Sequence, residues 1–207
     1  MKLDQALEIA LRRKAELAPY CERIEIAGSI RRLRPEPHDI EMVAIPKPYE
    51  VGLFASGIAP IVNRWEKVKG ELPCKYTQRM LPEGIVLDLF FARPENWGLI
   101  YAIRTGSADY SHWVLAAGWV RMGYHSVDGM LTWNGEPVPV REEQDLFAMA
   151  GVAWCRPEER RVYQRMERKG THGNRTLVVA GGDGGDGGRR AGAGVAPGKA
   201  SAGAVVG

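Results

Sequence analysis

The sequence has no apolar run close to the roughly 20 residues that a membrane-spanning helix requires. It also lacks the layout of a cleavable signal peptide, because its first segment, MKLDQALEIALRRK, mixes both charge signs with periodic apolar residues. We therefore expect a protein with no membrane partner that is located in the cytoplasm.

Cysteine is scarce, with three residues in 207, at Cys21, Cys74 and Cys155. They are far apart and form no C-x-x-C pair, which argues against both a zinc site and a disulfide framework. The interpretation that remains is reduced thiols with a structural role.

Excess charge is absent from most of the chain. The segment that starts at Lys169 holds five basic and two acidic residues, and it therefore carries the whole formal charge of +3. Any polyanion that binds the preceding residues must be held by local patches of charge rather than by a general basic character.

Large side chains are rare in that C-terminal segment, which reads GGDGGDGGRRAGAGVAPGKASAGAVVG near its end. A glycine-rich segment without hydrophobic periodicity cannot offset the entropy lost on ordering. We expect residues 169–207 to be a disordered, dispensable Gly/Ala-rich extension; a basic arm that contacts nucleic acid is the alternative.

The remaining residues alternate between helical and strand patterns, which predicts an α+β fold. Apolar residues at helical spacing predict a first helix over Leu3–Ala18, and two Gly-containing turns predict a small sheet near residues 123–140. Further strands are expected over 23–28, 39–45 and 85–92, and further helices over 98–104, 111–122, 142–150 and 157–169. Within these helices we expect Trp113 in the core rather than stacked on a base, and Arg160 either on a solvated face or in contact with a DNA backbone.

Three acids interrupt the apolar strands. Asp39 and Glu41 are two positions apart, so both carboxylates leave the same face of their strand, about 6.6 Å apart along the backbone. Asp88, between Leu87 and Leu89, has the right pattern for an adjacent strand that adds a third ligand. Hard oxygen donors without a nearby His or Cys favour Mg²⁺ or Mn²⁺.

A glycine-serine turn precedes these acids. Gly28 permits close backbone approach, Ser29 can cap a helix or turn, and Arg31 and Arg32 offer planar donor groups for phosphate oxygens. A phosphate cradle followed by a carboxylate cluster suits two-metal phosphoryl or nucleotidyl transfer. Each piece alone has an ordinary alternative: a common loop, or an acid pair on a solvent-facing strand.

Taken in order, these motifs resemble the X-family (polymerase beta-like) DNA polymerases of the nucleotidyltransferase superfamily. The motifs are GSIRR, HDIEMV, IVLDLFF, RTGSADY and NGEPVPVREEQDLFAMAG followed by WCRPEERR. The resemblance extends from the first helix to about Arg161, without a lyase domain or a helix-hairpin-helix segment. It implies a minimal enzyme, similar to the smallest viral members, so action in a host cytoplasm is included in the expectation.

The resemblance also implies roles for individual residues. Asp39, Glu41 and Asp88 match the catalytic carboxylates that bind two Mg²⁺ or Mn²⁺ ions, with Asp88 also acting on the primer 3′-hydroxyl. The Gly106-Ser107 peptide bond is cis in the family. The implied nucleotide-binding residues are Gly28, Ser29, Arg32, Arg104, Thr105, Gly106 and Ser107.

Three positions depart from the family pattern. Glu41 stands where aspartate is usual, and its extra methylene could shift the metal geometry. Ile103-Arg104 replaces a Tyr-Phe pair that helps to exclude ribonucleotides. His38 replaces the glycine expected just before the first acid, which weakens one phosphate contact.

We therefore expect a nucleotidyltransferase palm with a mixed sheet (1–95), a small α+β nascent-base-pair subdomain (96–168) and a disordered tail (169–207). The expected function is template-directed DNA synthesis by a monomer, filling short gaps in DNA repair, with gapped or primed DNA and a (d)NTP as partners. Two alternatives remain: template-independent nucleotidyl transfer to RNA, a small molecule or a protein, and a catalytically impaired DNA-end-binding protein.

Overall fold

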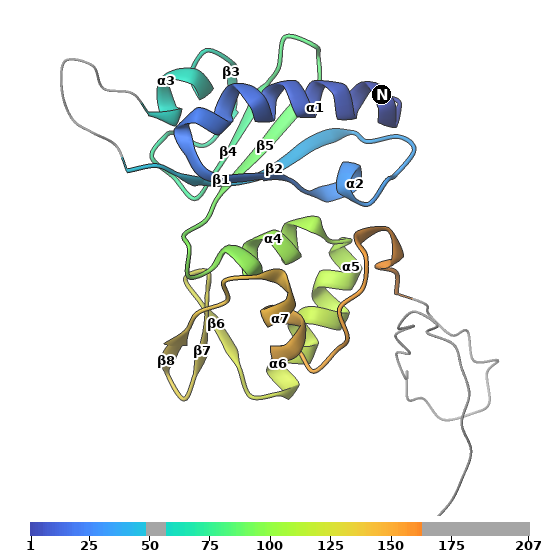
Figure 1. Ribbon diagram of the computed structural model, residues 1–207, viewed down its shortest axis with the longest axis vertical. Helices are drawn as coiled ribbons and strands as arrows, with labels where there is room; N and C mark the ends of the chain where they lie inside the picture. Colours follow the sequence, from blue (N-terminus) through green and yellow to red (C-terminus); the bar gives the residue numbers. More distant parts are fainter. Residues whose placement is uncertain (49–56, 163–207) are drawn as a thin grey trace, which may run out of the picture.

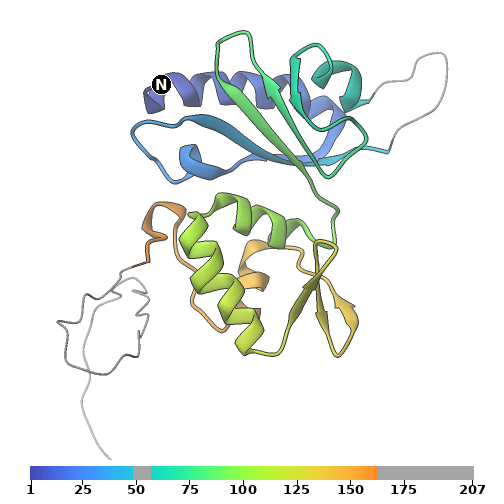
Figure 2. The same cartoon turned by 180° about the vertical axis from the view of Figure 1, so that it is seen from behind.

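The computed structural model describes residues 1–48 and 57–162. Two units follow one another along the chain (Figures 1 and 2): a sheet unit, from α1 to β5, and a C-terminal unit, from α4 onward. The elements are α1 (Leu3–Leu17), β1 (Cys21–Ile26), α2 (Gly28–Arg31), β2 (Asp39–Pro46), α3 (Ile58–Val62), β3 (Glu66–Lys69), β4 (Tyr76–Met80), β5 (Val86–Phe91), α4 (Trp97–Thr105), α5 (Ala108–Tyr110), a π-helical stretch (Ser111–Ala116), α6 (Ala117–Arg121), β6 (His125–Val127), β7 (Met130–Trp133), β8 (Glu136–Val138) and α7 (Glu143–Met149).

The larger sheet is mixed, with five strands in the order β1-β2-β5-β4-β3. Only β2 and β5 are parallel to each other; the other neighbours are antiparallel. The parallel register places Glu41 beside Asp88, and the antiparallel register on the other side of β5 places Gln78 beside Asp88. The sequence predicted the α+β class and the strands β1, β2 and β5, but it did not predict β3 and β4.

The two faces of this sheet have different coverings. Alternate residues of β2 and β5, such as Ile40 and Leu87, point into a core that they share with α1 and α3. Helix α1 buries Ala6, Ile9, Ala10 and Leu17 on this side, and Pro19 follows it in a short 3₁₀ turn. The opposite face packs Val43 and Phe90 against Trp97 of α4. The acids of β2 and β5 alternate with Ile40 and Leu87, so they lie on this second face of the sheet. Figure 1 shows α4 of the C-terminal unit next to the sheet unit.

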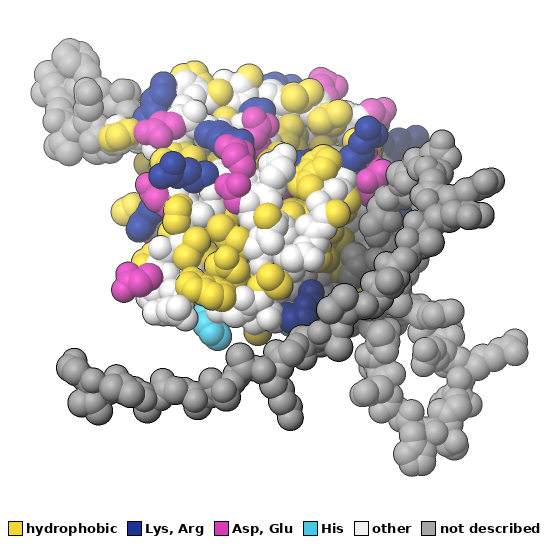
Figure 3. Space-filling model, turned by 60° about the horizontal axis from the view of Figure 1, so that its bottom comes forward, with side chains coloured by type: hydrophobic (Ala, Val, Ile, Leu, Met, Phe, Trp, Pro, Cys, Tyr) yellow, Lys and Arg dark blue, Asp and Glu magenta, His cyan; other side chains and the backbone are white. Residues whose placement is uncertain are grey.

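The C-terminal unit has its own core, built on α4, the helical stretch over 108–121, β7 and α7. The expected small sheet is present, with strand order β6-β7-β8 and the predicted turns at Asp128-Gly129 and Asn134-Gly135. On the face shown in Figure 3, both signs of charge are interspersed and apolar side chains gather on the lower part.

Three expectations for this unit were wrong. The helix expected from Pro157 is a 3₁₀ turn of three residues, Pro157–Glu159, and the chain is not helical from Arg160 to residue 162. Arg160, expected on a solvated or DNA-gripping face, is completely buried. Trp113, expected in the core, is 48% exposed, because it lies on the outer side of the π-helical stretch.

The expected disordered tail, 169–207, and the end of the last predicted helix lie outside the described residues. Within the described parts, no helix is long and apolar enough to cross a membrane.

Candidate functional site

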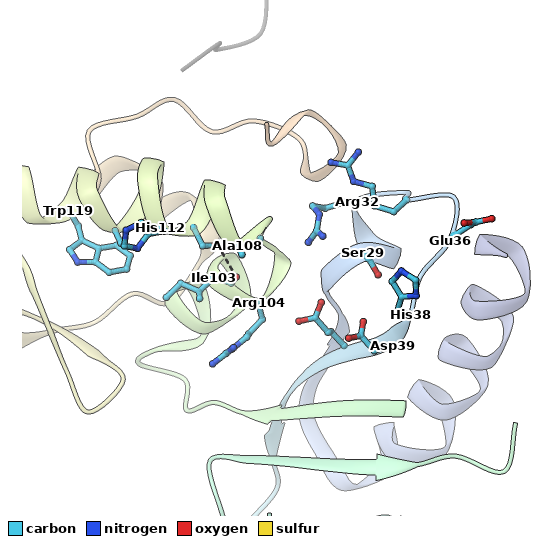
Figure 4. Close-up of a pocket in the computed structure, with 15 residues that line it drawn as sticks. Ser29, Arg32, Glu36, His38, Asp39, Ile103, Arg104, Ala108, His112 and Trp119 are labelled. Atoms are coloured by element: carbon cyan, nitrogen blue, oxygen red, sulfur yellow. Dashed lines mark hydrogen bonds between the residues drawn. The ribbon is translucent and has the colours of Figure 1, made fainter. Parts of the chain in front are cut away.

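A cavity of about 710 Å³ lies between the two units and is lined by both of them. Figure 4 shows Ser29, Arg32 and Asp39 on one side of it and Ile103 and His112 on the other. The predicted site residues that line it are Ser29, Arg32, Asp39, Glu41, Arg104 and Gly106. Its volume is typical of small-molecule sites.

The three predicted carboxylates share one face of the sheet. Asp39 and Glu41 alternate with Ile40 along β2, and the strand register sets Asp88 next to Glu41. Asp39 and Glu41 line the cavity, whereas Asp88 lies deeper and is 9% exposed. None of the three forms a salt bridge within the described parts of the chain.

This arrangement concentrates negative charge. Burial raises the pKa of Glu41 to about 7, and the neighbouring charge of Asp39 acts in the same direction, against the positive charge of Arg32. Burial and the charge of Asp88 likewise raise the pKa of Asp39. Carboxylates that repel one another in a half-buried site are stabilised by a bound cation.

The residues fit a divalent cation in their chemistry but do not form a closed cage. Within residues 1–48 and 57–162, no group of three or more Asp, Glu, His or Cys side chains is arranged to hold a metal ion as it stands. Mg²⁺ retains several water molecules and substrate phosphates in its coordination shell, so an open set of one or two carboxylates is its usual protein site.

Gly28 leaves room for the side chain of Glu41 next to the turn. It has a φ of +61°, which favours glycine, and a Cβ built there would lie 1.7 Å from Oε2 of Glu41. Ser29 does not cap a helix as expected, because Ala27 occupies the N-cap position of the four-residue α2. Instead the Ser29 Oγ is buried beside the cavity without a hydrogen-bond partner among the described residues.

Both arginines of the GSIRR motif contact Thr105. The Arg31 Nη1 donates to its hydroxyl oxygen at 2.6 Å, and the Arg32 Nη1 donates to its carbonyl oxygen. Burial lowers the pKa of Arg32. These bonds link the turn after β1 to the end of α4, which places the two predicted nucleotide-binding segments on opposite walls of the cavity.

The other residues of the RTGS segment have separate positions. The Gly106-Ser107 bond is cis, as the resemblance implied. Ser107 is the N-cap of α5, accepts a hydrogen bond from the Tyr110 N–H at 3.4 Å, and is not part of the cavity lining. Arg104 is exposed, with its guanidinium 4.0 Å from the centre of the Phe90 ring.

Several residues of the site could not be predicted from local sequence patterns. The hydroxyl of Tyr76 and the amide of Gln78 each donate to Oδ1 of Asp88, both at 2.8 Å. Their strand, β4, has no conspicuous pattern, so its pairing with β5 could not be predicted. The cavity lining also includes Arg34, Glu36, His38, Ile103, Ala108, Ser111, His112, Ala116 and Trp119.

A second missed group joins the two units. Glu143, at the start of α7, accepts two hydrogen bonds from Arg31, at 2.7 and 2.9 Å, and one from the buried Arg160 at 2.9 Å. Trp154 donates to the same carboxylate at 3.2 Å. This ion cluster fixes Arg31 behind the cavity wall.

No protein-family model matches the chain, and the comparison with curated proteins gives no match either.

Proposed function

We propose that this chain is a metal-dependent nucleotidyltransferase of the X-family polymerase type, which transfers a nucleotide from a (d)NTP to a primer 3′-hydroxyl in short-gap DNA repair. The observation that carries the proposal is the placement of Asp39, Glu41 and Asp88 on one sheet face without a salt bridge among the described residues, beside a cavity whose walls carry Ser29 and Arg32.

In this proposal each wall of the cavity has its own task. Arg32 and Ser29 bind the triphosphate, Arg32 with its charge and planar donor group and Ser29 with a hydroxyl that lacks a described partner. The end of α4, with Ile103 and Arg104, lies against the sugar and base. Asp39, Glu41 and Asp88 would hold two Mg²⁺ or Mn²⁺ ions.

When bound, the ions would supply Lewis-acid stabilisation of the negative charge that develops during the transfer. Asp88 takes the proton of the primer 3′-hydroxyl, whose oxygen forms a new bond to the α-phosphorus. The bond from that phosphorus to the bridging oxygen breaks, and pyrophosphate leaves.

The partners are gapped or primed DNA and a nucleoside triphosphate, the enzyme acts as a monomer, and the place of action is the cytoplasm.

The test is primer extension on a duplex with a one-nucleotide gap, with Mg²⁺ or Mn²⁺ and each dNTP and rNTP supplied singly. The wild type is compared with Asp88→Asn, which keeps the shape of the side chain, and with Asp128→Asn as a control. Asp128 has a 90% exposed side chain in the β6–β7 turn, at a φ of +51° that asparagine tolerates.

We expect the wild type and Asp128→Asn to insert only the templated nucleotide. Asp88→Asn should be slower by about 100-fold or more, because even outer-shell partners of metal ligands contribute about 10- to 100-fold. Full activity of Asp88→Asn would refute the proposal. Untemplated addition would support a template-independent transferase instead, and inactivity on every substrate would support a DNA-end-binding protein.

A further inference from the structure

Asp88 is held by two neutral donors on the neighbouring strand. Both Tyr76 and Gln78 donate to the same oxygen, Oδ1, at 2.8 Å. The other oxygen, Oδ2, accepts no hydrogen bond from any side chain in the described parts of the chain. One half of the carboxylate is therefore fixed by the protein, and the other half is left for a ligand.

The sheet itself aligns these donors. Gln78 is the direct cross-strand neighbour of Asp88, and Tyr76 is the neighbour of Phe90, one step further on the same face. The Tyr76 ring stacks on the Phe90 ring, with 4.7 Å between the ring centroids and an interplanar angle of 17°. This stacking holds the ring, so the hydroxyl is directed at Asp88 before any ligand arrives.

The neutrality of both donors has a functional meaning. A buried carboxylate with a structural role is normally paired with a cation, as Glu143 is with Arg31 and Arg160. Asp88 is 9% exposed but has no salt-bridge partner among the described residues. Its orientation is thus restricted while its charge stays available, which is the requirement for a carboxylate that must bind a cation from outside the protein.

We propose that Tyr76 and Gln78 are positioning residues, which fix Asp88 through Oδ1 so that Oδ2 is presented for cation binding beside Glu41. This inference rests on the proposed function. Neither residue lines the cavity proposed for the nucleotide, and their effect passes through the orientation of one carboxylate.

The test uses Tyr76→Phe, which keeps the stacking but removes the hydroxyl, and Gln78→Met, which keeps the length but removes the amide. The matched controls are Tyr124→Phe, whose hydroxyl makes no hydrogen bond within the described residues, and Gln144→Met on the exposed side of α7. Mn²⁺ binding to the full chain is measured from the electron paramagnetic resonance signal of the free ion. Thermal unfolding, kcat and the nucleotide KM are measured in parallel.

We expect each β4 variant to bind Mn²⁺ about 10-fold more weakly and to lose about 10-fold in kcat, with the nucleotide KM changed by less than about twofold. The controls should match the wild type. A lower melting temperature with unchanged Mn²⁺ affinity would show a structural role and overturn the inference. If the wild type binds Mn²⁺ and inserts nucleotides while both β4 variants behave like it, the inference fails alone. If the wild type binds no Mn²⁺, the inference and the proposed function fail together.

Discussion

Replacing Glu143 with glutamine is expected to destabilise the protein far more than the same replacement at the adjacent Glu142. The two side chains differ in burial, at 5% and 53% exposure. Glu143 is bonded to Arg31 and to the completely buried Arg160, whereas Glu142 pairs with the part-exposed Arg23. Removing one partner of a buried ion pair leaves an uncompensated charge, and exposed pairs contribute at most about 1 kcal/mol.

The size of the expected loss in unfolding free energy follows from the pKa of Glu143. Burial alone would raise this pKa, but the hydrogen bonds from Arg31 and Arg160 outweigh burial and lower it from 4.5 to about 2. A difference of this size between the folded and unfolded chain is equivalent to about 3 kcal/mol. Because the folded pKa is depressed, this stability is present above the unfolded value of 4.5 and is lost as the pH falls from there towards 2.

The assay is urea unfolding of the wild type, Glu143→Gln and Glu142→Gln at several pH values. At pH 7 we expect the free energy of unfolding to fall by about 3 kcal/mol in Glu143→Gln and by about 1 kcal/mol or less in Glu142→Gln. The gap between the wild type and Glu143→Gln should shrink below about pH 4.5. Equal losses in the two variants, or a gap that does not change with pH, would refute this reasoning.

The remaining predictions concern close contacts and the cavity wall. Gly28→Ala should abolish nucleotide incorporation in primer extension, because its Cβ would lie 1.7 Å from Oε2 of Glu41, and a fully active variant would contradict the assigned role of the turn. Gly98→Ala should lower the free energy of unfolding, measured in urea, by about 1 to 3 kcal/mol, because its Cβ would lie 2.1 Å from the Glu142 carbonyl oxygen. An unchanged urea midpoint of unfolding would show instead that α4 can move away from the start of α7 at little cost. Arg104→Met should raise the nucleotide KM about 10-fold with little change in melting temperature, since it removes an exposed charge from the cavity wall, and an unaltered KM would count against its role.

Local patterns were enough to predict the parts of the site that lie within single elements. The alternation of Asp39 and Glu41 with apolar residues placed both acids on one face of a strand, and the apolar neighbours of Asp88 placed it on a second strand. The structure has both strands, with Glu41 and Asp88 side by side. Period-two patterning determines the face to which a side chain points, and it needs no knowledge of the partner strand.

Contacts between distant segments were not predictable in the same way. Tyr76 and Gln78 reach Asp88 only through the register of β4 against β5. Arg31 meets Glu143 across 112 positions of sequence, in a cluster with Arg160 that had been expected on the surface. The sequence by itself thus determined the α+β class, most elements and the face on which the acids lie, because these follow from local periodicity. Only the tertiary structure decided which groups hold the acids and join the two units, because strand pairing and packing between units bring together residues whose local sequence carries no mark of the partner.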